Sequence, residues 1–207
     1  MKHNLNLAIW LTVSRLVLFP LAVIPLALGW SNGGLISACV TQAAGLTDFA
    51  DGIVARRMRQ TNSLGVNLDL LCDKIFIGGM WVTLAWLGVT PVWVPVIVLA
   101  REAAVSTVRY NRFRWNPPSA DIWGKAKTMV SFAAIEWVAL NKDLSSGGLV
   151  ASLGSHFNIK AILSVAPWLV WAAIALTVLS GLNYFRKFVR RSAAVPGVLI
   201  VGENKDV

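Results

Sequence analysis

Four aspartates lie close together in this sequence, between two of the most apolar parts of the chain. Asp48 and Asp51 are three residues apart, and Asp69 and Asp73 are four apart, so each pair shares one face if its segment is helical. Carboxylates crowded together in apolar surroundings repel one another and are stabilised by cations. Ligation by oxygen alone favours Mg²⁺, Mn²⁺ or Ca²⁺. The spacing therefore predicts a divalent-cation site with these four aspartates as ligands.

A purely structural alternative is an ionic cluster, in which the four carboxylates pair with Arg56, Arg57 and Arg59. Such a cluster accounts for the charges but leaves the glycines around them unexplained. Gly52 follows the first aspartate pair, and Gly65 precedes the second. A glycine inside a helix costs about 1 kcal/mol relative to alanine, so its presence suggests that a ligand approaches the backbone closely. The glycines favour the metal site.

The composition predicts the elements that must position these residues. Of the 207 residues, 56% are hydrophobic and only 14% are charged, whereas about a quarter are charged in a typical soluble domain. Apolar runs recur along the whole length, and a spanning helix needs roughly 20 mostly apolar residues. We therefore expect an all-α, polytopic membrane protein with six transmembrane helices over residues 1–191 and a flexible C-terminal tail over 192–207. The expected spans are residues 7–29, 33–57, 69–89, 91–113, 125–141 and 160–183.

The basic residues predict how these spans are oriented. With the N-terminus inside, Lys and Arg gather in the connection between spans two and three, in the connection between spans four and five, and in the tail. The outer segments then hold only Lys142 and Lys160. The positive-inside bias predicts that both termini and the aspartates face the cytoplasm, in the bacterial cytoplasmic membrane. The net charge of +9 is then explained by contacts with anionic lipid headgroups, and not by nucleic-acid binding.

The whole motif, D-x2-D-G-x2-A-R-x8-G-x3-D-x3-D from Asp48 to Asp73, resembles the complete signature of the CDP-alcohol phosphatidyltransferase family. The resemblance implies a six-helix membrane enzyme, usually a homodimer, that moves a phosphatidyl group from a CDP-linked lipid to an alcohol and releases CMP. It implies that the aspartates bind two divalent ions, Mg²⁺ or Mn²⁺, with Asp73 also acting as the base toward the acceptor hydroxyl. The residues that it implies for the CDP-lipid are Gly52, Ala55, Arg56 and Gly65, together with Thr12 and Arg15 in the first span.

Basic residues in the fourth and fifth spans bear on the acceptor alcohol. Arg101, Arg109, Lys125 and Lys127 lie where they could face the metal site, which suggests an acceptor that carries its own phosphate. The plainer alternative is that these residues anchor helices at the membrane interface, and that Arg101 pairs with its neighbour Glu102.

Residues 9–140 resemble the bacterial members of the family that use sn-glycerol 3-phosphate. This resemblance implies CDP-diacylglycerol and glycerol 3-phosphate as substrates, and phosphatidylglycerol phosphate and CMP as products. One departure concerns the first span, where the family commonly has Pro-Asn and this chain has Ala8 and Ile9. An asparagine contact to the nucleotide or lipid is then missing, or is supplied by Asn4 or Asn6.

Three other functions fit parts of the pattern. A sister enzyme of the family could take another acceptor, as cardiolipin synthase and the inositol phosphate and serine enzymes do. A membrane prenyltransferase also uses aspartate-rich helices and Mg²⁺, but its motifs fall in separate helix pairs of a larger bundle. An ion or proton transporter would use carboxylates near the bilayer midplane and would have no need for the glycines.

Overall fold

The structure is a computed structural model that describes residues 2–58, 63–111, 122–154 and 158–193. Side chains are described for residues 14–47 and 71–107, and for residues 124–189 with gaps at 125, 155–157 and 188.

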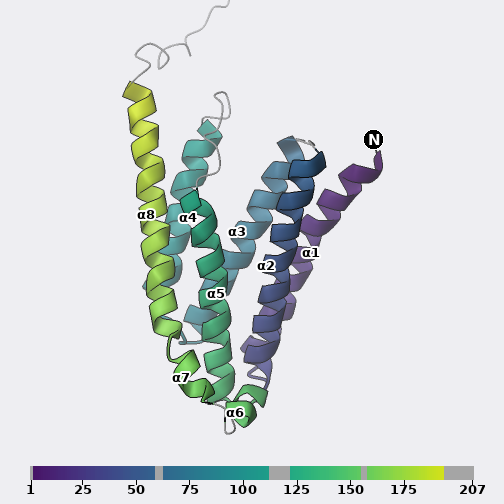
Figure 1. Ribbon diagram of the computed structural model, residues 1–207, viewed down its shortest axis with the longest axis vertical. Helices are drawn as coiled ribbons and strands as arrows, with labels where there is room; N and C mark the ends of the chain where they lie inside the picture. Colours follow the sequence, from purple (N-terminus) through teal and green to yellow (C-terminus); the bar gives the residue numbers. More distant parts are fainter. Residues whose placement is uncertain (1, 59–62, 112–121, 155–157, 194–207) are drawn as a thin grey trace, which may run out of the picture.

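Six long helices and two short ones make up the described part of the chain, and the long ones run side by side (Figure 1). The long helices are α1 (Lys2–Ala27), α2 (Gly33–Met58), α3 (Ser63–Trp86), α4 (Trp93–Asn111), α5 (Ile122–Ser145) and α8 (Ala166–Ala193). The short helices α6 (Leu149–Gly154) and α7 (Ile159–Leu163) lie together at one end of the bundle. The other end, where α2 ends at Met58 and α3 begins at Ser63, is called the motif end below.

The long helices follow the order of the six expected spans. By length and composition, however, only the stretch Ile159–Lys187 is apolar enough to cross a membrane among the described residues, with a mean hydropathy of 2.2. A shorter apolar helix covers Ser14–Ala27. The structure therefore shows an all-helical protein with at least one candidate span, and the six-span arrangement remains a prediction.

Several helix boundaries differ from the expected ones. The last expected span, 160–183, is divided into α7 and α8 by a turn at Ser164 and Val165. Helix α5 continues to Ser145, beyond the expected end at residue 141. Gly29 and Gly88, with φ angles of 67° and 69°, form the turns after α1 and α3, where a residue with a side chain would be strained.

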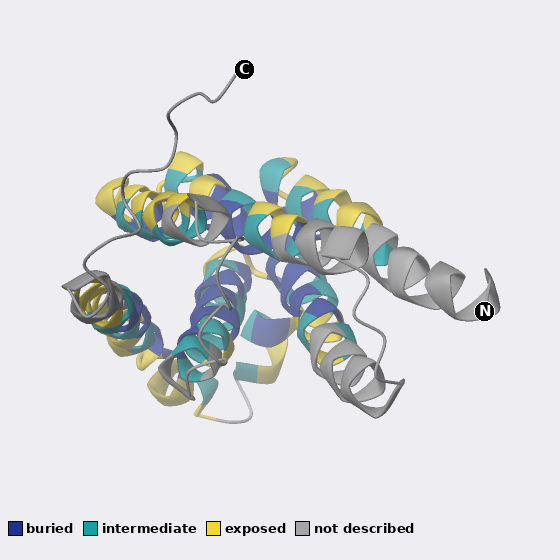
Figure 2. Ribbon diagram, turned by 90° about the horizontal axis from the view of Figure 1, so that it is seen from above, coloured by how far each residue is buried: buried dark blue, intermediate teal, exposed yellow. Residues whose placement is uncertain are grey.

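The core lies between the helices, whose buried faces point inward (Figure 2). Helix α1 packs against α2 and α3, and α5 packs against α2 and α8. An aromatic stack crosses the bundle from α1 through α3 to α5. Phe76 meets Phe19 edge-on at a centroid distance of 6.1 Å and stacks on Phe132 at 6.0 Å. These rings hold α1, α3 and α5 together midway along the bundle.

At the opposite end of the bundle, a buried carboxylate of α5 joins this helix to α2 and α6. Asp143 is 0% exposed, and its two oxygens accept backbone N–H groups of Leu35, at 3.1 Å, and Val150, at 3.2 Å. These N–H groups belong to the first turns of α2 and α6, where a negative charge is favourable. A side chain at Gly34 would lie 2.2 Å from the carbonyl oxygen of Ala139, so only glycine allows α2 this close to α5.

Asp143→Ala should lower the free energy of unfolding by about 2 kcal/mol or more, because it leaves two N–H donors without their acceptor. Thermal unfolding in detergent should show a lower midpoint. The matched control is Ser145→Ala, whose exposed hydroxyl donates only to a carbonyl of its own helix; its effect should stay within about 0.5 kcal/mol. Equal thermal midpoints for the two variants would show that the hydrogen bonds of Asp143 to α2 and α6 do not stabilise the protein.

Candidate active site

The four aspartates of the motif lie on α2 and α3, on the parts of these helices that meet the motif end (Figure 1). The connection between the two helices, residues 59–62, lies outside the described residues, but four residues cannot separate Met58 from Ser63 widely. Within the described part of the chain, α1 packs against both helices, and so does α5. Helices α1 and α5 therefore form a common support for the two aspartate-bearing helices.

Only one of the four aspartate side chains is described. Asp73 is partly buried on α3 and has an attractive electrostatic interaction with Lys127 of α5. The side chains of Asp48, Asp51 and Asp69 lie outside the described residues. No group of three possible ligands occurs among the side chains that are described, and that part of the chain includes only Asp73 of the motif. A divalent ion fits by the chemistry of the donor set, which consists of carboxylate oxygens near one end of the bundle.

Of the residues expected to bind the CDP-lipid, Arg15 is the one whose side chain is described. It is only 1% exposed on α1, one turn before Phe19 of the aromatic stack. An arginine so deeply buried fits a role in binding an anionic group or in holding the helices together. The backbones of the others lie in α1, α2 and α3, and their side chains lie outside the described residues: Thr12, Gly52, Ala55, Arg56 and Gly65.

Two of the four basic residues expected at the acceptor meet at one carboxylate. The Nη1 atom of Arg101 donates to Oε1 of Glu102 at 2.7 Å, and the ammonium of Lys127 donates to the same oxygen. The three side chains are 16%, 14% and 7% exposed for Arg101, Glu102 and Lys127. The side chains of Arg109 and Lys125 lie outside the described residues. The structure therefore brings Arg101 and Lys127 together from α4 and α5.

The ionic cluster of Arg101, Glu102 and Lys127 has further contacts with α8 and α3. Nη2 of Arg101 donates to the hydroxyl of Ser180 on α8 at 2.6 Å. The hydroxyl of Ser106 donates to the backbone carbonyl of Glu102 and accepts a hydrogen bond from the ammonium of Lys74. Lys74 directly follows Asp73, the last residue of the motif, so these hydrogen bonds connect the cluster to the aspartate-bearing helix α3.

The sequence also matches a known family of enzymes. Residues 5–179 match the family described as CDP-alcohol phosphatidyltransferase. The chain belongs to the CDP-alcohol phosphatidyltransferase family. It is therefore a transferase, and its family is embedded in membranes and uses divalent metal ions.

Named relatives within this family come from several bacteria. A probable phosphatidylglycerophosphate synthase of Mycobacterium tuberculosis is 32% identical over 188 residues, which cover 89% of this chain and 82% of the relative. A CDP-diacylglycerol–glycerol-3-phosphate 3-phosphatidyltransferase of Haemophilus influenzae is 28% identical over 87% of this chain and 92% of the relative. A cardiolipin synthase (CMP-forming) of Streptomyces coelicolor is 32% identical over 75% of this chain and 69% of the relative.

Several contacts of this candidate site do not follow from the sequence. The sequence suggests the pairing of Arg101 with Glu102 only as an alternative to acceptor binding, and it does not place Lys127 at the same carboxylate. The available signal was the presence of Glu102 inside an apolar segment, where a lone charge is costly. Nothing in the sequence pointed to Ser106 or Ser180, because an isolated serine in a helix is common and reveals no partner.

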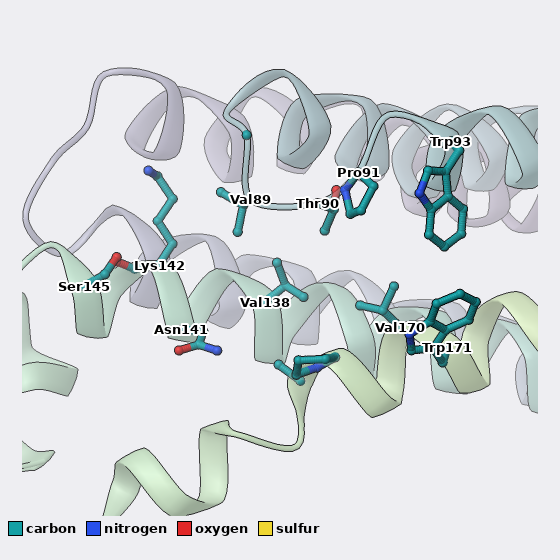
Figure 3. Close-up of a pocket in the computed structure, with 13 residues that line it drawn as sticks. Val89, Thr90, Pro91, Trp93, Val138, Asn141, Lys142, Ser145, Val170 and Trp171 are labelled. Carbon is teal, nitrogen blue, oxygen red and sulfur yellow. The ribbon is translucent and has the colours of Figure 1, made fainter.

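A pocket of about 480 Å³ lies away from the motif, at the opposite end of the bundle (Figure 3). It opens between the turn after α3, the last turns of α5 and the first turns of α8, and Lys142 and Ser145 lie at one side of it. The rings of Trp93 and Trp171 meet on its other side at a centroid distance of 5.2 Å. None of the described residues that line this pocket is predicted to take part in phosphatidyl transfer.

Proposed function

We propose that this protein transfers the phosphatidyl group of CDP-diacylglycerol to sn-glycerol 3-phosphate, giving phosphatidylglycerol phosphate and CMP, in phospholipid biosynthesis. The observation that carries the proposal is the complete aspartate motif on α2 and α3, beside a cluster of buried cations on α4 and α5. The names of the relatives from Mycobacterium tuberculosis and Haemophilus influenzae support this acceptor.

In this proposal Asp48, Asp51, Asp69 and Asp73 hold two divalent ions, Mg²⁺ or Mn²⁺. When bound, such ions screen the charge of the diphosphate and stabilise the leaving CMP. Asp73 accepts the proton of the acceptor hydroxyl, which needs a carboxylate within hydrogen-bond reach. The hydroxyl oxygen then forms a bond to the phosphorus of the phosphatidyl group, and the bond from that phosphorus to the oxygen of CMP breaks.

The other residues of the proposed site bind the two substrates. Thr12, Arg15 and Arg56 contact the CDP-lipid, with Gly52, Ala55 and Gly65 leaving room for its nucleotide. The phosphate of glycerol 3-phosphate binds to the cations of α4 and α5, because charge-assisted hydrogen bonds to phosphate are strong. The residues proposed for the acceptor are Arg101, Arg109, Lys125 and Lys127.

We expect glycerol 3-phosphate to support release of CMP from CDP-diacylglycerol by the purified protein. Glycerol, serine, inositol phosphate and phosphatidylglycerol, tested at the same concentrations, should give little or none. The likeness to a cardiolipin synthase makes phosphatidylglycerol the most informative alternative acceptor. Release of CMP with phosphatidylglycerol and not with glycerol 3-phosphate would replace the proposed reaction by cardiolipin synthesis.

The proposal includes a homodimer with six spans per chain in the bacterial cytoplasmic membrane. Both termini and the active site face the cytoplasm, as the distribution of basic residues favours. A single cysteine at Asn62 should therefore be labelled from the cytoplasmic side, and one at Ser146 from the outside, in a background without Cys39 and Cys72. The opposite labelling pattern would reverse the proposed orientation.

A further inference from the structure

Glu102 is the centre of the ionic cluster beside the aspartate motif. One of its oxygens accepts hydrogen bonds from both Arg101 and Lys127, and all three side chains are largely buried. Two cations this close together in apolar surroundings would repel each other without the carboxylate. Glu102 therefore fixes the place of both cations and leaves the three groups with one net positive charge.

The two cations differ in how firmly the rest of the protein holds them. Arg101 has a second partner in Ser180 and lies against α8, where a side chain at Gly181 would come within 3.2 Å of its Cγ. The Lys127 ammonium donates to Glu102, which lies on a neighbouring helix. A lysine side chain is flexible, so its position depends on this carboxylate more than the position of Arg101 does.

We propose that Glu102 is a positioning residue, which holds the Lys127 ammonium beside Arg101 so that Lys127 can bind the phosphate of the acceptor. This inference rests on the proposed function and adds to it a residue that does not itself touch the substrate. Lys127 has three N–H donors. Glu102 uses one of them and orients the others.

The test measures CMP release by the purified, full-length protein with each substrate varied in turn. Glu102→Gln removes the charge but nearly keeps the shape of the side chain, and should raise the KM for glycerol 3-phosphate about tenfold. The KM for CDP-diacylglycerol should change by less than about twofold. The matched control is Glu136→Gln, the same substitution at a carboxyl group of α5 that faces Gln42, outside the cluster. It should leave both KM values unchanged.

A double variant separates positioning from mere support of the fold. If Glu102 acts through Lys127, the Glu102→Gln and Lys127→Gln pair should have the same KM for glycerol 3-phosphate as Lys127→Gln alone. The proposal would be overturned if the KM of the double variant for glycerol 3-phosphate rose by the product of the two single effects. An equal rise of both KM values in Glu102→Gln would also overturn it. A lower KM for glycerol 3-phosphate in Glu102→Gln would also overturn it, because Glu102 would then compete with the phosphate.

A second variant covers the case in which Glu102→Gln does not fold. Glu102→Asp keeps the charge and shortens the side chain, and should raise the same KM by a smaller factor. An unchanged KM in Glu102→Asp would then contradict the proposal. Failure of the parent protein to release CMP with glycerol 3-phosphate would count against the proposed function. An active parent with normal kinetics in Glu102→Gln would count against the role of Glu102 alone.

Discussion

Asp48→Asn, Asp51→Asn and Asp69→Asn should each lower the rate of CMP release by about a hundred- to a thousandfold, while the protein still inserts and folds. Each substitution removes one carboxylate from the proposed metal site, which holds two cations against a diphosphate and would bind them less well with less charge. The asparagine keeps nearly the same shape, so packing on α2 and α3 is preserved. The measurement is initial CMP release at saturating substrates, over a range of Mg²⁺ and Mn²⁺ concentrations.

The control for the aspartate variants is a carboxylate at the other end of the bundle. Asp143→Asn changes the same chemical group, but its effect should fall on the thermal midpoint and not on activity per folded molecule. Near-normal activity at low Mg²⁺ in any one motif variant would remove that aspartate from the metal site. Partial recovery of CMP release at high metal concentration would indicate that the variant still binds the ions, but more weakly.

The order of the helices could be predicted from the sequence because apolar runs and turn residues alternate along the chain. The turns at Gly29 and Gly88 fall where the sequence breaks its apolar runs, and both glycines have the positive φ that such turns use. The end of α5 could not be placed in this way. Its polar residues after position 141 indicate a connection, yet the helix continues to Ser145 because Asp143 is buried against the first turns of α2 and α6.

The motif residues could be identified in the sequence, since the spacing of acids and glycines is local information, and their chemistry stays a prediction. Contacts between distant segments could not be predicted in this way. Arg101 and Ser180 are 79 residues apart in the sequence, and no periodic pattern connects them. Phe76 stacks on Phe132 through the same kind of long-range packing. Such contacts depend on which helix faces meet, and amphipathic patterning is weak in helices that are apolar all round.

Lys125→Gln and Arg109→Gln should each raise the KM for glycerol 3-phosphate by about one to two powers of ten. Each removes one charge-assisted hydrogen bond to the acceptor phosphate, worth about 1.5–3 kcal/mol, and about 1.4 kcal/mol corresponds to a tenfold change in binding. Binding of CDP-diacylglycerol should change little, because in the proposed site the motif aspartates and Arg56 bind that substrate.

The experiment for these two variants follows CMP release while each substrate is varied at saturation of the other. Lys160→Gln is the matched control, since it removes a cation from α7 at the end of the bundle opposite the motif, and should leave both KM values unchanged. An equal rise in the KM for CDP-diacylglycerol would contradict the proposal that these cations bind the acceptor while other residues bind the CDP-lipid. Full activity of the parent protein with free glycerol would exclude a phosphate pocket, because these cations would then have no anionic group of the acceptor to bind.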